Sequence, residues 1–165
     1  MRYKFCPICG NELQKHSIPD EGLVSFCEVC SKPYFMSSGI SVLVVLINEQ
    51  NEIVLTKQRH IAEDKWILIS GYLKQGEDIE ETVNREVKEE TGLDVTRQIY
   101  ISSYYHDESD LLILGFAAYV NKKEFVGSQE IDEIGWFVID EAVQAIWKGS
   151  IAEKLLLKTI ETLKI

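Results

Sequence analysis

Two glutamates, Glu86 and Glu90, have the clearest chemical potential in this sequence. They lie between residues 77 and 91, a stretch without glycine or proline that mixes apolar and charged residues and is expected to be helical. With about 3.6 residues per turn, Ile79 and Val83 mark the buried row of that helix, and Glu86 and Glu90 continue it. Half-buried carboxylates are costly unless a cation compensates them. The pattern therefore indicates a site that attracts positive charge.

A hard divalent ion is one way to supply that charge. Glu89 flanks the same edge of the helix, so up to three carboxylates can converge on Mg²⁺ or Mn²⁺, which prefer oxygen ligands and often bridge to phosphates. The alternative is an ordinary surface helix, whose glutamates are solvated and supported by pairs four residues apart. The two interpretations differ in whether Glu86 and Glu90 are buried.

The cysteines form a second constellation near the start of the chain. Cys6 and Cys9 make one Cys-x-x-Cys pair, Cys27 and Cys30 make another, and seventeen residues separate the pairs. This spacing is typical of four-thiolate zinc sites, in which the ion supplies folding free energy to a segment without a core. The alternative is a redox-active pair, but one Cys-x-x-Cys at the start of a helix would suffice for that. Four ligands leave no open position, so the expected Zn²⁺ is structural.

Two modules are expected to position these groups. Residues 1–37 are rich in cysteine and polar residues and are expected to form a zinc ribbon, whereas residues 38–165 contain the apolar runs of a larger domain. Asp140 is expected to cap a short helix that runs through Trp147, and Ser150 is expected to cap a helix from Ile151 to Leu163. Strands are expected at 40–47, 53–55, 66–69, 99–101, 111–120 and 135–139. The expected fold class is α+β, an α/β/α sandwich with a mixed sheet behind the ribbon.

Composition narrows the classes of partner. The chain has 27 acidic and 17 basic residues and a formal charge of −10, which argues against a nucleic-acid partner because polyanions need a basic face. No apolar run approaches the roughly 20 residues that span a bilayer, and no secretory leader is evident. A cytoplasmic protein without a membrane partner is expected.

The acidic segment also matches a known motif, Gly-x5-Glu-x7-Arg-Glu-U-x-Glu-Glu-x-Gly-U, where U is aliphatic. The nine specified positions are occupied by Gly71, Glu77, Arg85, Glu86, Val87, Glu89, Glu90, Gly92 and Leu93. On this motif, which is called the Nudix box, the chain resembles the Nudix hydrolase superfamily, whose fold is the α/β/α sandwich. A four-cysteine ribbon directly before such a domain resembles the NADH pyrophosphatase group.

The resemblance implies roles for residues of the motif. Glu86, Glu89 and Glu90 would be catalytic and would hold Mg²⁺ or Mn²⁺, and a backbone carbonyl of Ser70 or Gly71 would be a further ligand. Gly71, Glu77, Arg85 and Gly92 would be structural, with Glu77 and Arg85 paired to brace the loop and helix.

Residues outside the motif complete the implied site. Glu130 is the candidate for an additional catalytic acid and metal ligand, with Glu133 as its reserve and as a candidate substrate contact. Tyr72 is a candidate for stacking on a base or nicotinamide ring, although a core role is the alternative. Lys57 and Arg59 are candidates for contacts to substrate phosphates, and the alternative for both is a surface role.

The implied activity is cleavage of the pyrophosphate in a nucleoside diphosphate linked to another moiety, such as NAD(H), ADP-ribose or a sugar nucleotide. The alternative is a non-hydrolytic Nudix module that binds a nucleotide as a sensor. NADH pyrophosphatases carry the motif Ser-Gln-Pro-Trp-Pro-Phe-Pro-x-Ser shortly after the box, whereas residues 102–109 here contain no proline. Tyr104 and Tyr105 are the remaining stacking candidates there. The ribbon is expected to pack on the sheet or on a second subunit of a homodimer.

Overall fold

The computed structural model of the 165-residue chain describes residues 4–35, 38–59, 62–126 and 131–165. The chain forms two compact units, Met1–Ser38 and Gly39–Ile165. Among the described residues, no helix combines the length and apolar character needed to cross a bilayer.

The smaller unit is a three-stranded antiparallel sheet. Its strands are β1 (Gln14–Ile18), β2 (Gly22–Cys27) and β3 (Lys32–Tyr34), in the order β1-β2-β3. Its buried apolar cluster consists of Cys6, Leu13 and Cys27, with Cys30 and Tyr34 packed against it. A core this small, made largely of thiols, contributes little hydrophobic stabilisation.

The larger unit is a mixed sheet between helices. Its elements are β4 (Gly39–Ile47), β5 (Ile53–Lys57), β6 (Ile69–Tyr72), α1 (Ile79–Thr91), β7 (Arg97–His106), β8 (Leu111–Tyr119), β9 (Glu133–Phe137), α2 (Ile139–Ala145) and α3 (Ile151–Leu163). The strand order is β7-β8-β4-β5-β9, and β6 pairs with β4. The β4–β8 pair is parallel and the other pairs are antiparallel. The sheet is therefore mixed, as the sequence predicts.

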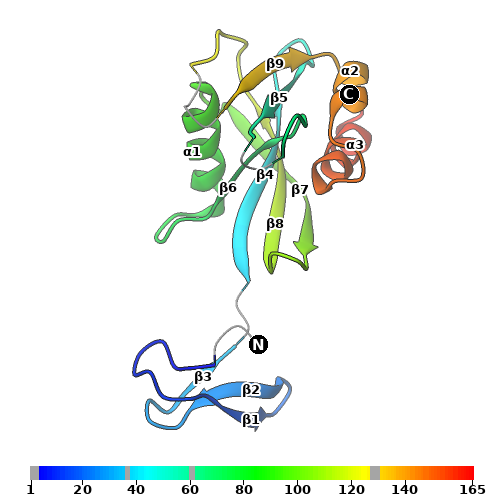
Figure 1. The fold of residues 1–165 in the computed structure, drawn as a ribbon. Helices are drawn as coiled ribbons and strands as arrows, with labels where there is room; N and C mark the ends of the chain where they lie inside the picture. The colour runs from blue at the N-terminus through cyan, green and yellow to red at the C-terminus, as the bar shows by residue number, and fades with distance from the viewer. Residues whose placement is uncertain (1–3, 36–37, 60–61, 127–130) are drawn as a thin grey trace. The chain divides into compact units, whose positions relative to one another are not determined.

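Helices cover both faces of this sheet. In Figure 1, α1 lies against one face, and α2 and α3 lie against the other. One apolar cluster joins the sheet to α1 through Val83 and Val87, and a second joins it to α3 through Leu155 and Leu156. Strand β4 is buried on both faces, which explains its uninterrupted apolar sequence. The α/β/α sandwich is confirmed.

Strand β6 begins and ends about three residues later than the sequence predicts. Pairing with β4 runs from Val44 opposite Ile69 to Ser41 opposite Tyr72, while Trp66 and Ile67 form only isolated bridges. Strands β4 and β5 pair at one position, Ile47 opposite Ile53. The edge of the first half of β4 is therefore available for pairing with β6. The box glycine, expected to follow a strand, consequently lies inside one.

The helix boundaries depend on local caps. Helix α1 begins at Ile79, two residues later than expected, because Asp78 is its N-cap and the Asp78 N–H donates to the Glu81 carboxylate at 3.0 Å. The expected Asp140 cap is wrong: Val138 is the N-cap of α2, and Asp140 lies in its first turn. The Ser150 cap of α3 is confirmed by its hydroxyl, which accepts from the Glu153 N–H at 3.1 Å.

Candidate functional site

Glu86 and Glu90 are buried beneath the sheet, with 9% and 5% of their surfaces exposed. This confirms the row predicted from the helical spacing and rules out the fully solvated alternative. Glu89, on the edge of the same helix, keeps 52% of its side chain exposed.

Gly71 makes the close approach of β6 to α1 possible. A Cβ atom at this position would lie 1.9 Å from the carboxylate carbon of Glu86, well inside van der Waals contact. The absence of a side chain therefore lets the backbone of the box strand lie directly against a box carboxylate. Polar backbone and carboxylate oxygens are the ligand types that Mg²⁺ and Mn²⁺ prefer.

The guanidinium of Arg85 donates hydrogen bonds to several groups in the loop before α1 and on α1 itself. This guanidinium binds both oxygens of Glu77, at 2.6 and 3.0 Å, and it also donates to the carbonyl of Tyr72 at 3.0 Å. The same group donates to Glu86 at 2.5 Å and to Glu89 at 3.0 Å. Such bidentate, charge-assisted contacts fix the loop geometry before the helix.

These contacts shift the pKa values of the participants. The hydrogen bonds to Arg85 lower the pKa of Glu77 to about 2, and the pairing with Glu77 raises the pKa of Arg85. Burial raises the pKa of Glu86, although Arg85 opposes that shift. Additional positive charge near Glu86 would therefore be favourable.

The structure corrects one step of the sequence argument. Arg85 already stands beside Glu86 and Glu89 as a compensating cation, so the burial of Glu86 does not by itself require a metal ion. What points toward a cation site is the raised pKa of Glu86 together with the position of its carboxylate directly against the backbone of Gly71.

Glu90 has a contact that the sequence analysis missed. The side-chain amide of Gln58 donates to its Oε2 atom at 3.0 Å, and Gln58 is only 3% exposed. Gln58 directly follows β5, and sequence reasoning selected its charged neighbours instead. The available signal was a polar side chain at the end of a buried strand.

Three candidate residues around β5 and β9, Lys57, Arg59 and Glu133, all form ion pairs there. Lys57 pairs with Glu133 at 3.0 Å and lies over the Trp66 ring at 4.8 Å. Arg59 pairs with Asp132 at 3.2 Å. These ion pairs join the end of β5 to the start of β9. Glu130, the candidate additional ligand, lies outside the described residues.

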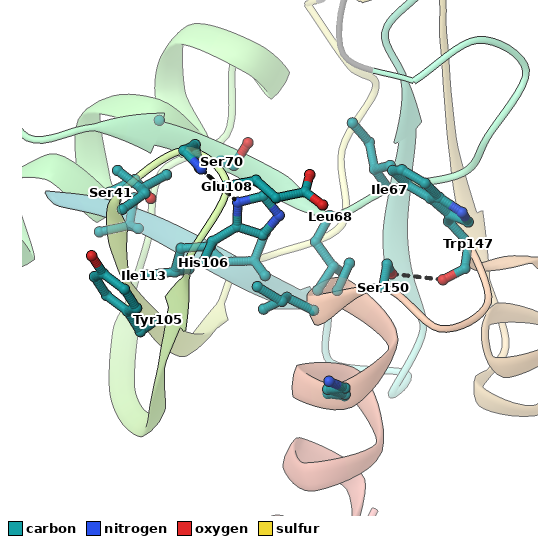
Figure 2. Close-up of a pocket in the computed structure, with 18 of the residues that line it drawn as sticks. Ser41, Ile67, Leu68, Ser70, Tyr105, His106, Glu108, Ile113, Trp147 and Ser150 are labelled. Carbon is teal, nitrogen blue, oxygen red and sulfur yellow. Dashed lines mark hydrogen bonds between the residues drawn. The ribbon is translucent and has the colours of Figure 1, made fainter. Parts of the chain in front are cut away.

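A cavity of about 950 Å³ opens beside the box strand. Ser70, Gly71 and Tyr72 form part of its wall, and other parts come from β4, from the segment before β6, from the β7–β8 hairpin and from residues 147–154. Figure 2 shows His106 and Trp147 on opposite sides, with Leu68 between them. The volume falls within the range of small-molecule sites, roughly 300–1,000 Å³.

The two candidate tyrosines, Tyr104 and Tyr105, lie in different surroundings. Tyr105 lines it and donates from its hydroxyl to Asp110 at 2.6 Å. Tyr104 instead packs on the apolar cluster beside α3 and accepts a hydrogen bond from Ser102. Tyr72, with 64% of its surface exposed, is at the cavity wall rather than in the core. His106, left unassigned from sequence, also lines the cavity.

The four cysteine sulfurs of the smaller unit all lie within 4.8 Å of one another. Cys6 and Cys30 are 3.9 Å apart, and Cys9 and Cys27 are 3.5 Å apart. A tetrahedral ion with metal–sulfur bonds of about 2.3 Å places its ligands roughly 3.8 Å apart, so the cluster fits Zn²⁺. Over the described ranges, it is the one group of three or more Cys, His or acidic side chains with this proximity.

Hydrogen-bond donors surround the sulfurs. The Tyr34 hydroxyl lies 3.1 Å from Cys6, the Asn11 amide donates to Cys9 at 3.4 Å, and the Cys30 N–H donates to Cys27 at 3.4 Å. Burial raises the pKa of the Cys6 thiol, but the hydrogen bonds from Tyr34 and from the backbone of Ile8 and Cys9 together outweigh it, and the pKa falls to about 6. These donors favour the thiolate form at Cys6, which is the form that binds metals.

Comparisons with known proteins identify the family of the larger unit. The family model of the NUDIX domain matches residues 37–158. A NAD-capped RNA hydrolase NudC from Stutzerimonas stutzeri is 30% identical over 94% of this chain and 55% of its own length. The human NAD-capped RNA hydrolase NUDT12 is 27% identical over 90% of this chain and 34% of its own length. The chain thus spans about half, or less, of these relatives.

Solved structures share the fold. A NUDIX hydrolase from Nitrosomonas europaea superimposes with a TM-score of 0.69 at 22% identity, covering 97% of this chain and 91% of that one. The NUDIX domain of Shewanella oneidensis NrtR, solved in complex with ADP ribose, gives 0.67 at 15% identity over 78% of this chain and 90% of that one.

Proposed function

We propose that this chain, which belongs to the NUDIX domain family, is a divalent-metal-dependent hydrolase that cleaves the pyrophosphate of a nucleoside diphosphate linked to a second moiety. The observation that carries this proposal is the meeting point at Gly71. There the box strand abuts the buried carboxylate of Glu86 and also lines a cavity of nucleotide size.

The residues that would hold Mg²⁺ or Mn²⁺ are Glu86, Glu89, Glu90 and Glu130, with the carbonyl of Ser70 or Gly71. The oxygen-only donor set and the raised pKa of Glu86 fit a hard cation. The bound ions supply charge neutralisation at the pyrophosphate and a lowered pKa of an attacking water.

The remaining residues would position the substrate and activate the attacking water. One box glutamate would accept the proton of the attacking water, while Arg85 and Glu77 keep the loop before α1 fixed. Tyr72 would stack on a ring of the substrate at the cavity wall. Lys57 and Arg59 would exchange their acidic partners, Glu133 and Asp132, for substrate phosphates.

The substrate class is a compound such as NAD(H), ADP-ribose or a sugar nucleotide. Two findings support this: the relatives named NAD-capped RNA hydrolases and the NUDIX domain solved with ADP ribose. The net charge of −10 disfavours extended contacts to RNA, and the names of the relatives make a capped RNA end the informative exception to test. The ribbon would hold structural Zn²⁺, and the protein would be a homodimer that acts in the cytoplasm.

Product analysis over a substrate panel tests the proposal. NADH, NAD⁺, ADP-ribose, sugar nucleotides, diadenosine polyphosphates, nucleoside triphosphates and a NAD-capped RNA are incubated with Mg²⁺ or Mn²⁺. Metal-dependent turnover of one class, lost in Glu90→Gln, is the expected result. Tight nucleotide binding by calorimetry with no turnover across the panel would reject the hydrolase and favour the sensor.

A further inference from the structure

Gln58 is a buried polar residue that contacts a carboxylate of the box from outside the motif. Its exposed fraction is 3%, and its amide reaches from the end of β5 to Glu90 on α1, a residue 32 positions later in the sequence. The backbone at this point is also fixed, because the Gln58 carbonyl accepts from the Ala62 N–H at 3.0 Å. The amide therefore lies directly after a strand of the sheet, at a position where the backbone is hydrogen-bonded.

The chemistry of an amide suits a carboxylate that binds metal. A hydrogen-bond donor limits the rotation of the Glu90 carboxylate, which is itself buried. Unlike an arginine or lysine at the same place, an amide brings no positive charge of its own to repel a divalent ion. Partners of this kind orient metal ligands, and their loss typically weakens metal binding about 10- to 100-fold.

We propose that Gln58 is a positioning residue that orients the Glu90 carboxylate for the divalent ion. This inference rests on the proposed metal site of the box. It assigns Gln58 no contact with the substrate. The consequence is that metal affinity, rather than nucleotide affinity or overall stability, depends on this side chain.

Calorimetric titration with Mn²⁺ in the absence of nucleotide tests the inference on the full chain. The variants are Gln58→Leu, which keeps a similar volume without a donor, and Gln58→Asn, whose shorter amide falls short of Glu90. Gln98→Leu is the matched control, since the Gln98 amide also donates to α1 but to the backbone carbonyl of Glu80 at 3.3 Å. Thermal unfolding in a chelator monitors the fold of each variant.

Both Gln58 variants are expected to raise the dissociation constant for Mn²⁺ at least about 10-fold, while Gln98→Leu leaves it unchanged. The Mg²⁺ concentration for half-maximal turnover should rise in parallel, and KM for the nucleotide at saturating metal should stay constant. Should Gln58→Leu fail to fold, Gln58→Asn provides the same comparison.

An unchanged Mn²⁺ affinity in a folded Gln58 variant, or an equal loss in Gln98→Leu, would overturn the role of Gln58 alone. A wild-type protein that binds Mn²⁺ but hydrolyses nothing would reject the proposed activity and still decide the role of Gln58. A wild-type protein that binds no Mn²⁺ would reject both.

Discussion

The ribbon and the box place their ligand groups in opposite surroundings. The four thiols lie together in a cluster whose own sulfurs make up much of the buried core of the ribbon. The carboxylates of Glu86 and Glu90 instead sit at the margin of a large apolar core and are held by Arg85 and Gln58. The ribbon is therefore expected to need its ion for folding, whereas the box is expected to stay folded and use its ion for chemistry.

The largest effect is expected when zinc is withheld from the ribbon. Cys27→Ser removes a fully buried thiol, and structural zinc contributes on the order of 10 kcal/mol in small metal-folded units. Residues of the ribbon should become protease-sensitive and zinc content should fall, while residues 39–165 keep a cooperative unfolding transition. Loss of structure in both units together would contradict the separation between them.

The next effect tests the box. Glu86→Gln should lower turnover on the order of 10³-fold, because an ion ligand worth several kcal/mol is lost. The melting temperature in a chelator should not fall, since burial makes the ionised Glu86 unfavourable, as its raised pKa indicates. A variant that loses activity through unfolding would show that Glu86 supports the fold instead.

Gly71→Ala probes the contact between β6 and α1. The new methyl group would overlap the Glu86 carboxylate, and overpacking of this kind costs about 1–3 kcal/mol. Activity should fall more steeply than the free energy of unfolding, because the displaced group is a proposed ligand. Ser70→Ala, which changes the adjacent residue of the strand, provides the control; equal losses in both variants would argue against a special role for Gly71.

Acid stability sharpens the comparison further. In the folded protein, the hydrogen bonds from Arg85 lower the pKa of Glu77 to about 2. The ion pair between Glu77 and Arg85 therefore stabilises the protein at neutral pH. That contribution is expected to shrink as pH falls from about 4.5 toward 2. Urea unfolding from pH 3 to pH 7 should show wild type converging on Glu77→Gln at the acid end. Parallel curves would contradict the shift.

The smallest effect is expected at the edge of the thiol cluster. Tyr34→Phe removes the hydroxyl next to Cys6 but keeps the ring that packs on the ribbon core. Loss of one hydrogen bond, about 1 kcal/mol, should speed zinc release to a chromogenic chelator about fivefold. Tyr100→Phe, on the larger unit, should leave the rate unchanged.

Local patterns predicted the parts of the site that depend on one segment. The burial of Glu86 and Glu90 follows from helical spacing, and the Ser150 cap follows from residue type at a helix start. Pairing between distant segments was less predictable. The displaced β6 depends on the divergence of β4 from β5, a tertiary feature.

The same limit explains the misassigned side chains. Gln58 reaches Glu90 across the fold, so no short window of sequence contains both. Tyr104 and Tyr105 are adjacent and chemically alike, and only the alternation of β7 sends one to the apolar cluster and the other to the cavity. Backbone periodicity was visible, but the register of β7 against its neighbours was not.

The cavity wall has a consequence for how such a protein can diversify. Most of the proposed metal ligands lie in one continuous stretch that contains α1, whereas part of the cavity wall is built from residues 107–109 and 147–150, in two short connections between elements. Exchanging those connections alters the shape and polarity offered to the incoming molecule without touching the carboxylates. Under the proposed function, substrate selectivity is therefore expected to change through these connections while the box carboxylates are kept.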